Sequence, residues 1–157
     1  WGSWTPHKYK IAVSGCPRNC AEATIKDFGI IGVDSGWEIH VAGNGGIKVR
    51  VTDFLCKVKT DEELFEMVKA YMQFYREDAY YLERTAHWIE RVGLEYVKEV
   101  LFDEEKRKMY AASFDISQKS AQVDPWAKAI EDGFTKEFSP IVIDPNDSHS
   151  FEAKEQI

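Results

Sequence analysis

The hydrophobic and polar positions follow a two-residue period in the first third of the chain. Apolar side chains alternate with small or charged ones at 9–13 and again at 37–41, the pattern of half-buried strands. A continuous apolar run at 28–33 predicts a buried strand, and the Asp-Ser-Gly tripeptide after it is typical of a turn. We therefore expect a strand at 9–13 and a β-hairpin over 28–42.

Two further elements complete the predicted sheet region. Residues 20–27 are mostly helix formers and are followed by Gly29, so they predict a short helix between the first two strands. Alternation returns at 47–51, which predicts another strand directly after the hairpin and its glycine-rich loop.

The period changes to three and four residues in the second half of the chain. Thr60 and Glu63 have the spacing of a capping box, in which each side chain satisfies a backbone amide at the start of a helix. The apolar positions after them predict a long amphipathic helix at 61–84.

Shorter helices should follow. We expect Thr85 to cap a helix that ends at Gly93, and a further helix to begin at Leu94 and become highly charged. The pattern predicts an α+β fold, with a mixed sheet in the order β-α-β-β-β and a helical C-terminal half within residues 1–114. Beyond it the periodicity fades, and we expect an irregular C-terminal extension at 115–157.

Charge and composition exclude several classes of function. The 157 residues carry 20 basic and 27 acidic side chains, a net charge of −7, which argues against a large nucleic-acid footprint. No apolar run approaches the roughly 18 residues of a membrane span, and no secretory signal is visible. The chain opens without Met, so we expect a piece of a longer protein. Three cysteines form a poor disulfide framework, which favours a reduced, cytoplasmic protein.

The most informative segment carries two cysteines separated by three residues. Cys16 and Cys20 lie between a predicted strand end and a predicted helix start, and in a helix both thiols would share one face, about 6 Å apart along the axis. Helix-start amides and Arg18 would stabilise thiolates, the form that binds metal. Two buried cysteines that happen to be near each other are the alternative. Cys56 is more simply a small buried side chain, so the chain holds half of a four-thiolate site.

A resemblance to a known family runs from about Thr5 to Trp126. It is carried by SGCPRNCAEATIKDFGIIGV, GWEIHVAGNGGIKVR and LCKVKT in that order. These segments closely resemble the C-terminal part of the sirohaem and 4Fe-4S domain shared by nitrite and sulfite reductases, which implies the fold of that domain. YLERTAHWIERVG is similar to the branch of bacterial assimilatory NAD(P)H nitrite reductases, specifically their large subunits.

The resemblance implies an activity and its cofactors. Members of this branch reduce nitrite to ammonium with six NAD(P)H-derived electrons, which pass through a 4Fe-4S cluster to sirohaem. The family's downstream cysteine pair matches Cys16 and Cys20 as cluster ligands, and Cys20 would also be the axial thiolate of the sirohaem iron. The family's upstream cysteine pair and its substrate-facing Arg and Lys residues have no counterpart here. We therefore expect no catalytic residue in this chain, and no bound cofactor or activity when it is isolated.

Sirohaem is a polycarboxylate and needs cationic and amide donors around its rim. The candidates for that role are Arg18, Asn19, Asn44, Lys48 and Arg50. Lys48 and Arg50 could equally be solvated charges on a strand, and the loop of Asn44 could be a plain turn. His40 and His87 lack a partner at ligand spacing, and we expect ordinary strand and helix residues there.

The resemblance also implies partners. These are the upstream domains of the same large subunit, which carry FAD and bind NAD(P)H, the small subunit of nitrite reductase, and nitrite itself. Nucleic acid and membrane partners are not expected. A non-catalytic iron–sulfur electron-transfer module and a sulfite reductase relative remain as alternatives. Without its upstream neighbour, strand 8–14 would be an exposed edge, so the isolated chain should self-associate there or cover it with residues 134–143.

Overall fold

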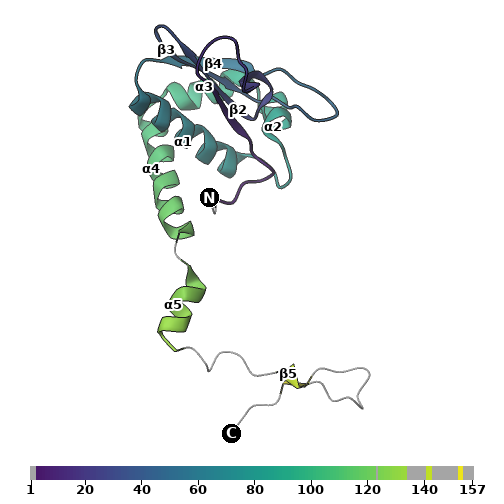
Figure 1. The fold of residues 1–157 in the computed structure, drawn as a ribbon, viewed down its shortest axis with the longest axis vertical. Coiled ribbons are helices and arrows are strands. Elements are labelled where there is room, and N and C mark those ends of the chain that lie inside the picture. The colour runs from purple at the N-terminus through teal and green to yellow at the C-terminus, as the bar shows by residue number, and fades with distance from the viewer. Residues whose placement is uncertain (1–2, 123, 134–140, 143–151, 154–157) are drawn as a thin grey trace. The chain divides into compact units, whose positions relative to one another are not determined.

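A computed structural model describes residues 3–122, 124–133, 141–142 and 152–153, and the chain divides into two compact units, 1–122 and 123–157. The described residues of the first unit form, in order, β1 (Ile11–Ser14), the 3-10 helix η1 (Ala23–Ile25), β2 (Phe28–Val33), β3 (Gly36–Val41), β4 (Asp53–Val58), α1 (Asp61–Asp78), α2 (Thr85–Val92), α3 (Leu94–Phe102) and α4 (Glu104–Ala121) (Figure 1). Those of the second unit form α5 (Pro125–Glu131) and the antiparallel pair β5 (Ile141–Val142) and β6 (Glu152–Ala153).

The four strands of the first unit form one mixed sheet in the order β1-β2-β3-β4. β1 pairs parallel with β2, which is possible because η1 lies in the connection between them, and the other two pairings are antiparallel. A register shift interrupts the last pairing between Ile39 and His40. The predicted hairpin over 28–42 and the mixed α+β architecture are therefore confirmed.

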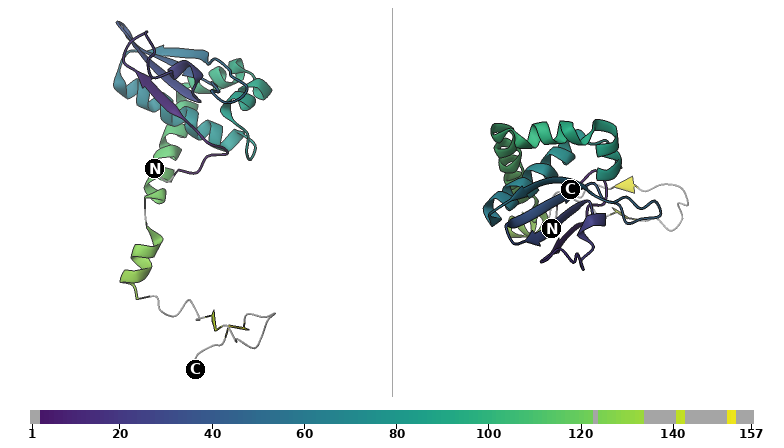
Figure 2. Two further views of the ribbon diagram at one scale, coloured as in Figure 1. Left: turned by 45° about the vertical axis from the view of Figure 1, so that its right-hand side comes forward. Right: turned by 90° about the horizontal axis from the view of Figure 1, so that it is seen from above.

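Helices α1 to α4 form a layer on one face of the sheet (Figure 2). Phe28 and Ile39 point from the sheet into this layer and are fully buried. They meet the aromatic side chains of the helices, where the Tyr71 ring lies 5.3 Å from Phe28 and 5.7 Å from Trp88. Each fully buried apolar side chain of this size stabilises the fold by about 2 kcal/mol. The buried aromatic residues of α1 thus form packing surface.

η1 lies against the opposite face of the sheet. Neighbouring residues of a strand point to opposite faces, and because Phe28 points to the helices, Gly29 points away from them. A side chain at position 29 would begin only 2.2 Å from the carbonyl oxygen of Ala23. Glycine is therefore required here for the chain segment after the cysteines to lie directly on β2.

Helix starts in the second half follow local rules. The Glu63 amide donates to the Thr60 hydroxyl at 3.2 Å, and the Thr60 amide donates back to the Glu63 carboxylate at 3.3 Å, so the predicted capping box is confirmed. Asp103 caps α4 by accepting hydrogen bonds from two amides of its first turn. Gly93, with φ 88°, separates α2 from α3 as expected.

Two elements predicted near the cysteines are wrong. The 20–27 helix is absent, because Glu22 adopts a left-handed conformation (φ 55°) and only Ala23–Ile25 form a 3-10 turn. The strand predicted at 47–51 is a loop closed by a bridge between Asn44 and Arg50, and the strand that pairs with β3 is Asp53–Val58. The first segment has helix-forming residues and the second alternates like a strand, but each is held by a distant residue. Thr24 accepts from the Thr52 amide, and Arg50 pairs with Glu90.

Helix boundaries also differ from expectation. α1 ends at Asp78 instead of 84, and Thr85 is the buried first residue of α2, whose cap position is Arg84. The charged run does not continue the helix from Leu94, because Asp103 ends α3 and starts α4. α4 then continues to Ala121, so residues 115–121 are helical and not irregular.

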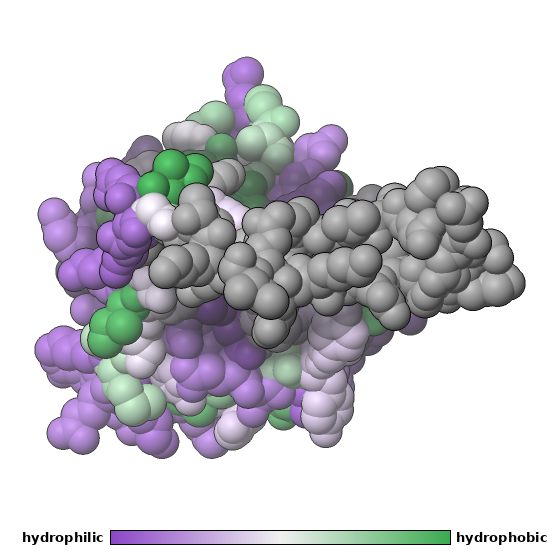
Figure 3. All heavy atoms as spheres, turned by 90° about the horizontal axis from the view of Figure 1, so that it is seen from below, coloured by the Kyte–Doolittle hydropathy of each residue, from purple (hydrophilic) through white to green (hydrophobic). Residues whose placement is uncertain are grey.

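Seen from below, the described surface is mainly hydrophilic, with hydrophobic side chains in separate groups (Figure 3). That agrees with the high content of charged residues, 30% of the chain. Among the described helices, none combines the length and the apolar character that crossing a bilayer demands.

Candidate cysteine-ligand site

Cys16 and Cys20 lie in the loop that leaves the end of β1, and both are exposed to solvent. The loop contains two consecutive turns, because the Asn19 amide donates to the Cys16 carbonyl at 3.1 Å and the Glu22 amide donates to the Asn19 carbonyl at 2.9 Å. The two thiols therefore lie on turns. Their spacing in the sequence predicts that they share one face of a helix, and that prediction is wrong. The expected stabilisation of thiolates by a helix dipole is absent, and Arg18 remains as the positive charge between them.

The side chain of Asn19 occupies the centre of this loop. Its Oδ1 atom accepts from the Ala23 amide at 2.7 Å and from the Ser14 hydroxyl at 3.1 Å, and its Nδ2 atom donates to the Thr24 hydroxyl at 2.7 Å. The buried Ser14 hydroxyl accepts in turn from the Ala21 amide at 3.2 Å. The loop is thus tied both to the end of β1 and to η1.

A hollow of about 350 Å³ lies beside Cys16. Gly15, Cys16 and Pro17 line one side, and the turn between β2 and β3 with Trp37 lines the other. The loop approaches β2 closely here, since a side chain at Gly32 would begin 2.7 Å from the Gly15 carbonyl oxygen. The Cys16 side of the loop therefore faces open space that a group larger than a water molecule can enter.

Cys56 lies apart from this loop. It is on β4, which is three strand spacings from β1, or about 14 Å across the sheet. Its side chain packs against the core on the helix side and lines a separate hollow of about 440 Å³ between β4, α1 and α4. Burial raises the pKa of the Cys56 thiol to about 11. Cys56 is therefore only half-buried, whereas the sequence predicts a buried side chain there.

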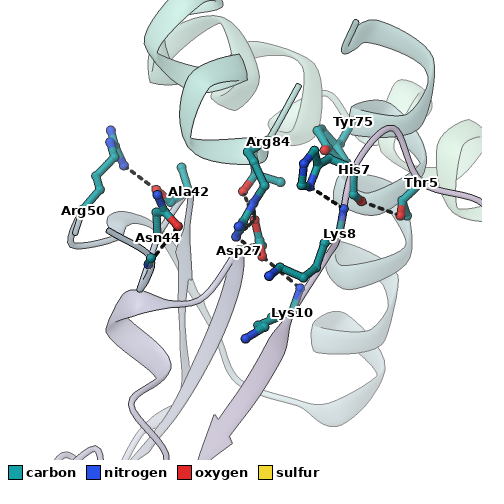
Figure 4. Close-up of polar contacts among 12 residues, drawn as sticks. Thr5, His7, Lys8, Lys10, Asp27, Ala42, Asn44, Arg50, Tyr75 and Arg84 are labelled. Atoms are coloured by element: carbon teal, nitrogen blue, oxygen red, sulfur yellow. Dashed lines mark hydrogen bonds and ion pairs between the residues drawn. The ribbon is translucent and has the colours of Figure 1, made fainter. Parts of the chain in front are cut away.

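The loop that carries Asn44, Lys48 and Arg50 is closed by its own polar groups. Asn44 and Arg50 exchange backbone hydrogen bonds of 2.9 and 2.8 Å, and the Asn44 side chain bonds the Lys48 carbonyl and the Gly46 amide. Arg50 donates to the Ala42 carbonyl at 2.7 Å and pairs with Asp53 at 2.8 Å and with Glu90 at 3.3 Å. Asn44 thus closes the loop, and Arg50 ties it to Ala42 directly after β3 (Figure 4).

The five residues predicted to face a polycarboxylate thus fall into two groups. Asn19, Asn44 and Arg50 already use their polar groups within the protein. Arg18 and Lys48 are exposed, and their side chains have no hydrogen-bond or ion-pair partner among the described residues.

A buried carboxylate that the sequence did not single out connects the two halves of the first unit. Asp27, fully buried just before β2, accepts from the Lys10 amide at 2.9 Å, from the Thr85 hydroxyl at 2.7 Å and from the Arg84 guanidinium at 2.8 to 3.2 Å (Figure 4). An acidic residue directly before a fully apolar strand was the available signal, because a buried charge requires partners. This network fixes the start of β2 and with it the segment that follows the cysteine loop.

Three tyrosine side chains lie near this network, and each interacts with the Asp27 charge. Burial raises the pKa of Tyr9 and of Tyr71 well above the ordinary value, and both hydroxyl groups lack a hydrogen-bond partner among the described residues. Tyr75 donates to the Glu83 carbonyl and its pKa is also raised, mainly by burial. These phenols are neutral packing groups.

The described residues hold no group of three or more His, Cys, Asp or Glu side chains that could bind a metal ion by itself. A cubane 4Fe-4S cluster takes four thiolates, whereas this loop offers two. The exposed thiols, the fixed loop and the hollow beside it fit one side of such a group.

Comparison with known proteins identifies the class. Residues 1–109 match the family described as nitrite and sulphite reductase 4Fe-4S domain. The chain belongs to this family, as its resemblance indicated.

Individual relatives within this family include both nitrite reductases and a sulfite reductase. The chain is 55% identical over 128 residues to a nitrite reductase [NAD(P)H] of Bacillus subtilis, a match that covers 82% of this chain and 16% of the relative. It is 45% identical over 105 residues to the nitrite reductase (NADH) large subunit of Escherichia coli, covering 66% of this chain and 12% of the relative. An assimilatory-type sulfite reductase of Nitratidesulfovibrio vulgaris is 31% identical over 96 residues, covering 61% of this chain and 44% of the relative. The chain thus spans less than a fifth of the length of these two nitrite reductases.

Proposed function

We propose that these residues are the C-terminal part of the redox domain of an assimilatory NAD(P)H nitrite reductase, which reduces nitrite to ammonium. The observation that carries the proposal is the pair of exposed thiols, Cys16 and Cys20, on one hydrogen-bonded loop in a chain of the 4Fe-4S family. The greater identity to nitrite reductases than to the sulfite reductase supports nitrite as the substrate.

In this proposal Cys16 and Cys20 supply two of the four thiolates of a 4Fe-4S cluster, and Cys20 also binds the iron of sirohaem. The other two thiolates come from polypeptide outside these 157 residues, because Cys56 lies on β4, which is about 14 Å across the sheet from β1, the strand that leads into the cysteine loop. The raised pKa of Cys56 also opposes the thiolate form that iron binds.

The cationic contacts of the sirohaem carboxylates are assigned to Arg18 and Lys48. Both are exposed and free of protein partners among the described residues, whereas Asn19, Asn44 and Arg50 act by shaping the loops. When bound, the cluster and sirohaem supply single electrons to the substrate at one iron. The residues of this chain hold the thiolates in place, and the two cations balance the carboxylate charge.

The proposed setting is the cytoplasm, within a large subunit whose other domains carry FAD and bind NAD(P)H and which works with a small subunit. The test uses the full-length polypeptide purified without oxygen. We expect sirohaem absorption bands and NAD(P)H-dependent conversion of nitrite to ammonium. Iron–sulfur absorption without sirohaem would indicate an electron-transfer module instead, and faster reduction of sulfite than of nitrite would indicate a sulfite reductase.

A partner for the β1 edge of the sheet is part of this proposal. β1 is an edge strand, and Ile11 and Val13 are about half exposed although their register neighbours on β2 are buried. In the isolated chain we expect β1 to pair with β1 of a second copy. An antiparallel pairing centred on Ala12 sets Ile11 opposite Val13 and Lys10 opposite Ser14, which keeps like charges apart.

Sedimentation tests this pairing. The wild-type chain should form dimers and the Val13→Lys variant should be monomeric. A monomeric wild-type chain whose 11–13 amides exchange rapidly would contradict it. The alternative cover, residues 134–143, lies outside the described residues apart from 141–142.

A further inference from the structure

Asn19 forms hydrogen bonds through its backbone and its side chain to residues on both sides of it in the cysteine loop. Its backbone amide and carbonyl close the two turns, and its side chain bonds Ser14, Ala23 and Thr24. All of these bonds lie between the end of β1 and η1, on either side of the two thiols. Both acceptor positions of its Oδ1 atom are used.

The backbone of Asn19 also suits this place. Its φ is 53°, in the left-handed region where most side chains are disfavoured and asparagine is tolerated. Asparagine therefore meets two requirements at once, a left-handed turn and a short amide that reaches both neighbouring segments. Glycine would meet only the first of these.

The anchors of Asn19 are themselves fixed. Ser14 is buried at the end of β1, and Ala23 is fully buried against β2. The carbonyl of Thr24 accepts from the Thr52 amide at 2.8 Å, which ties η1 to the segment before β4. The hydrogen bonds of Asn19 to these residues therefore fix the cysteine loop to the sheet.

We propose that Asn19 is a positioning residue that sets the placement of the Cys16 and Cys20 thiolates relative to each other, before any cofactor binds. This inference rests on the proposed function of the two cysteines as ligands. It replaces direct contact with sirohaem, the role that the sequence predicts for Asn19. A preformed pair binds a metal more tightly than a flexible pair, because less conformational entropy is lost on binding.

The test measures the affinity of the 157-residue chain for Cd²⁺ alone, followed by the thiolate-to-cadmium absorption in the ultraviolet. Asn19→Gly keeps the left-handed backbone and removes the side-chain bonds. We expect it to bind Cd²⁺ about tenfold more weakly, equivalent to about 1.4 kcal/mol. Asn44→Ala is the matched control, because it loosens a similar asparagine-centred loop that carries no cysteine. It should leave the Cd²⁺ affinity unchanged.

A second variant guards against misfolding of the first. Thr24→Val removes only the acceptor of the Asn19 Nδ2 atom and should weaken Cd²⁺ binding about threefold, the effect of part of one net hydrogen bond. The double variant should be no weaker than Asn19→Gly, since both changes act through one side chain. A merely structural role would lower the free energy of unfolding without changing the affinity of the folded chain.

The outcomes separate this inference from the proposed function. If Cys16→Ser and Cys20→Ser do not weaken Cd²⁺ binding, the ligand pair itself is wrong. If they do, but Asn19→Gly and Thr24→Val bind Cd²⁺ as tightly as the wild type, only the positioning role is overturned.

Discussion

Arg84 and Asp27 form a buried ion pair between residues 57 positions apart in the chain, with a shortest nitrogen-to-oxygen distance of 2.8 Å. The guanidinium, which belongs to the cap position of α2, contacts both carboxylate oxygens just before β2. The pair joins the helical half of the first unit to the segment that carries the cysteines.

Removal of the Asp27 charge should destabilise the chain strongly. Asp27→Asn leaves the Arg84 charge largely buried without its partner, so we expect the free energy of unfolding to fall by about 3 kcal/mol. Urea unfolding measures this. The control is Glu22→Gln, which removes an exposed ion pair with Lys26 and should cost less than about 0.5 kcal/mol. If the free energy of unfolding fell equally in the two variants, the buried ion pair would contribute no more to stability than the exposed one.

Replacement by alanine should change the free energy of unfolding very differently at two glycines near the cysteine loop. Gly29→Ala places a carbon 2.2 Å from the Ala23 carbonyl oxygen and should destabilise the chain by about 2 kcal/mol. Gly15→Ala meets nothing within 4 Å and should be neutral or slightly stabilising, because it restricts the unfolded chain. Thermal unfolding of both variants compares them. A tolerated Gly29→Ala would show that η1 does not lie directly on β2.

Stability should fall in acid. Hydrogen bonds from Arg91 lower the pKa of Glu83, and the Lys59 and Thr60 amides lower the pKa of Glu63. A carboxyl whose pKa is lower in the folded than in the unfolded state stabilises the fold above its unfolded pKa, near 4.3 for Glu. That contribution is lost as the pH falls through the folded value.

Urea unfolding between pH 3 and pH 7 measures this dependence. Glu83→Gln should lower the stability at pH 7 and flatten its decline in acid. Glu99→Gln changes an exposed carboxylate that forms no ion pair among the described residues and should keep the wild-type slope. An unchanged slope in Glu83→Gln would rule out this ion pair as a source of the acid sensitivity.

The three thiols should differ in reactivity. Because burial raises the pKa of Cys56 to about 11, only about one molecule in a thousand has a Cys56 thiolate at pH 8. Cys16 and Cys20 are exposed on the loop. Iodoacetamide should therefore label those two in the native chain and all three in urea, as read by peptide mass spectrometry. Rapid native labelling of Cys56 would contradict its half-buried position.

Elements set by neighbouring residues were predictable from the sequence. The capping box of α1 depends only on Thr60 and Glu63, and the hairpin over 28–42 depends on an apolar run and an alternating segment on either side of one turn. Elements set by distant contacts were not. Arg50 alternates like a strand residue, yet its bonds to Ala42 and Glu90 hold it in a loop.

The candidate site shows the same division. The spacing of Cys16 and Cys20 was visible in the sequence, but the turns that carry them are anchored by the burial of Ser14 in the sheet and by the hydrogen bond from the distant Thr52 amide to the Thr24 carbonyl. Asp27 was missed because its side-chain partners lie 17, 57 and 58 residues away. A local pattern can identify a ligand type, whereas the geometry of the ligand depends on the tertiary fold.

The proposed ligand assignment is Cys16 and Cys20 for the cluster, with Cys56 excluded. Iron and acid-labile sulfide content, measured in the full-length protein purified without oxygen, tests it most directly. We expect Cys56→Ser to keep about five irons per chain, four in the cluster and one in sirohaem, with about four sulfides, and Cys16→Ser and Cys20→Ser to lose the cluster, with Cys20→Ser also losing the normal sirohaem spectrum. A full cluster in Cys20→Ser, or its loss in Cys56→Ser alone, would contradict this ligand assignment.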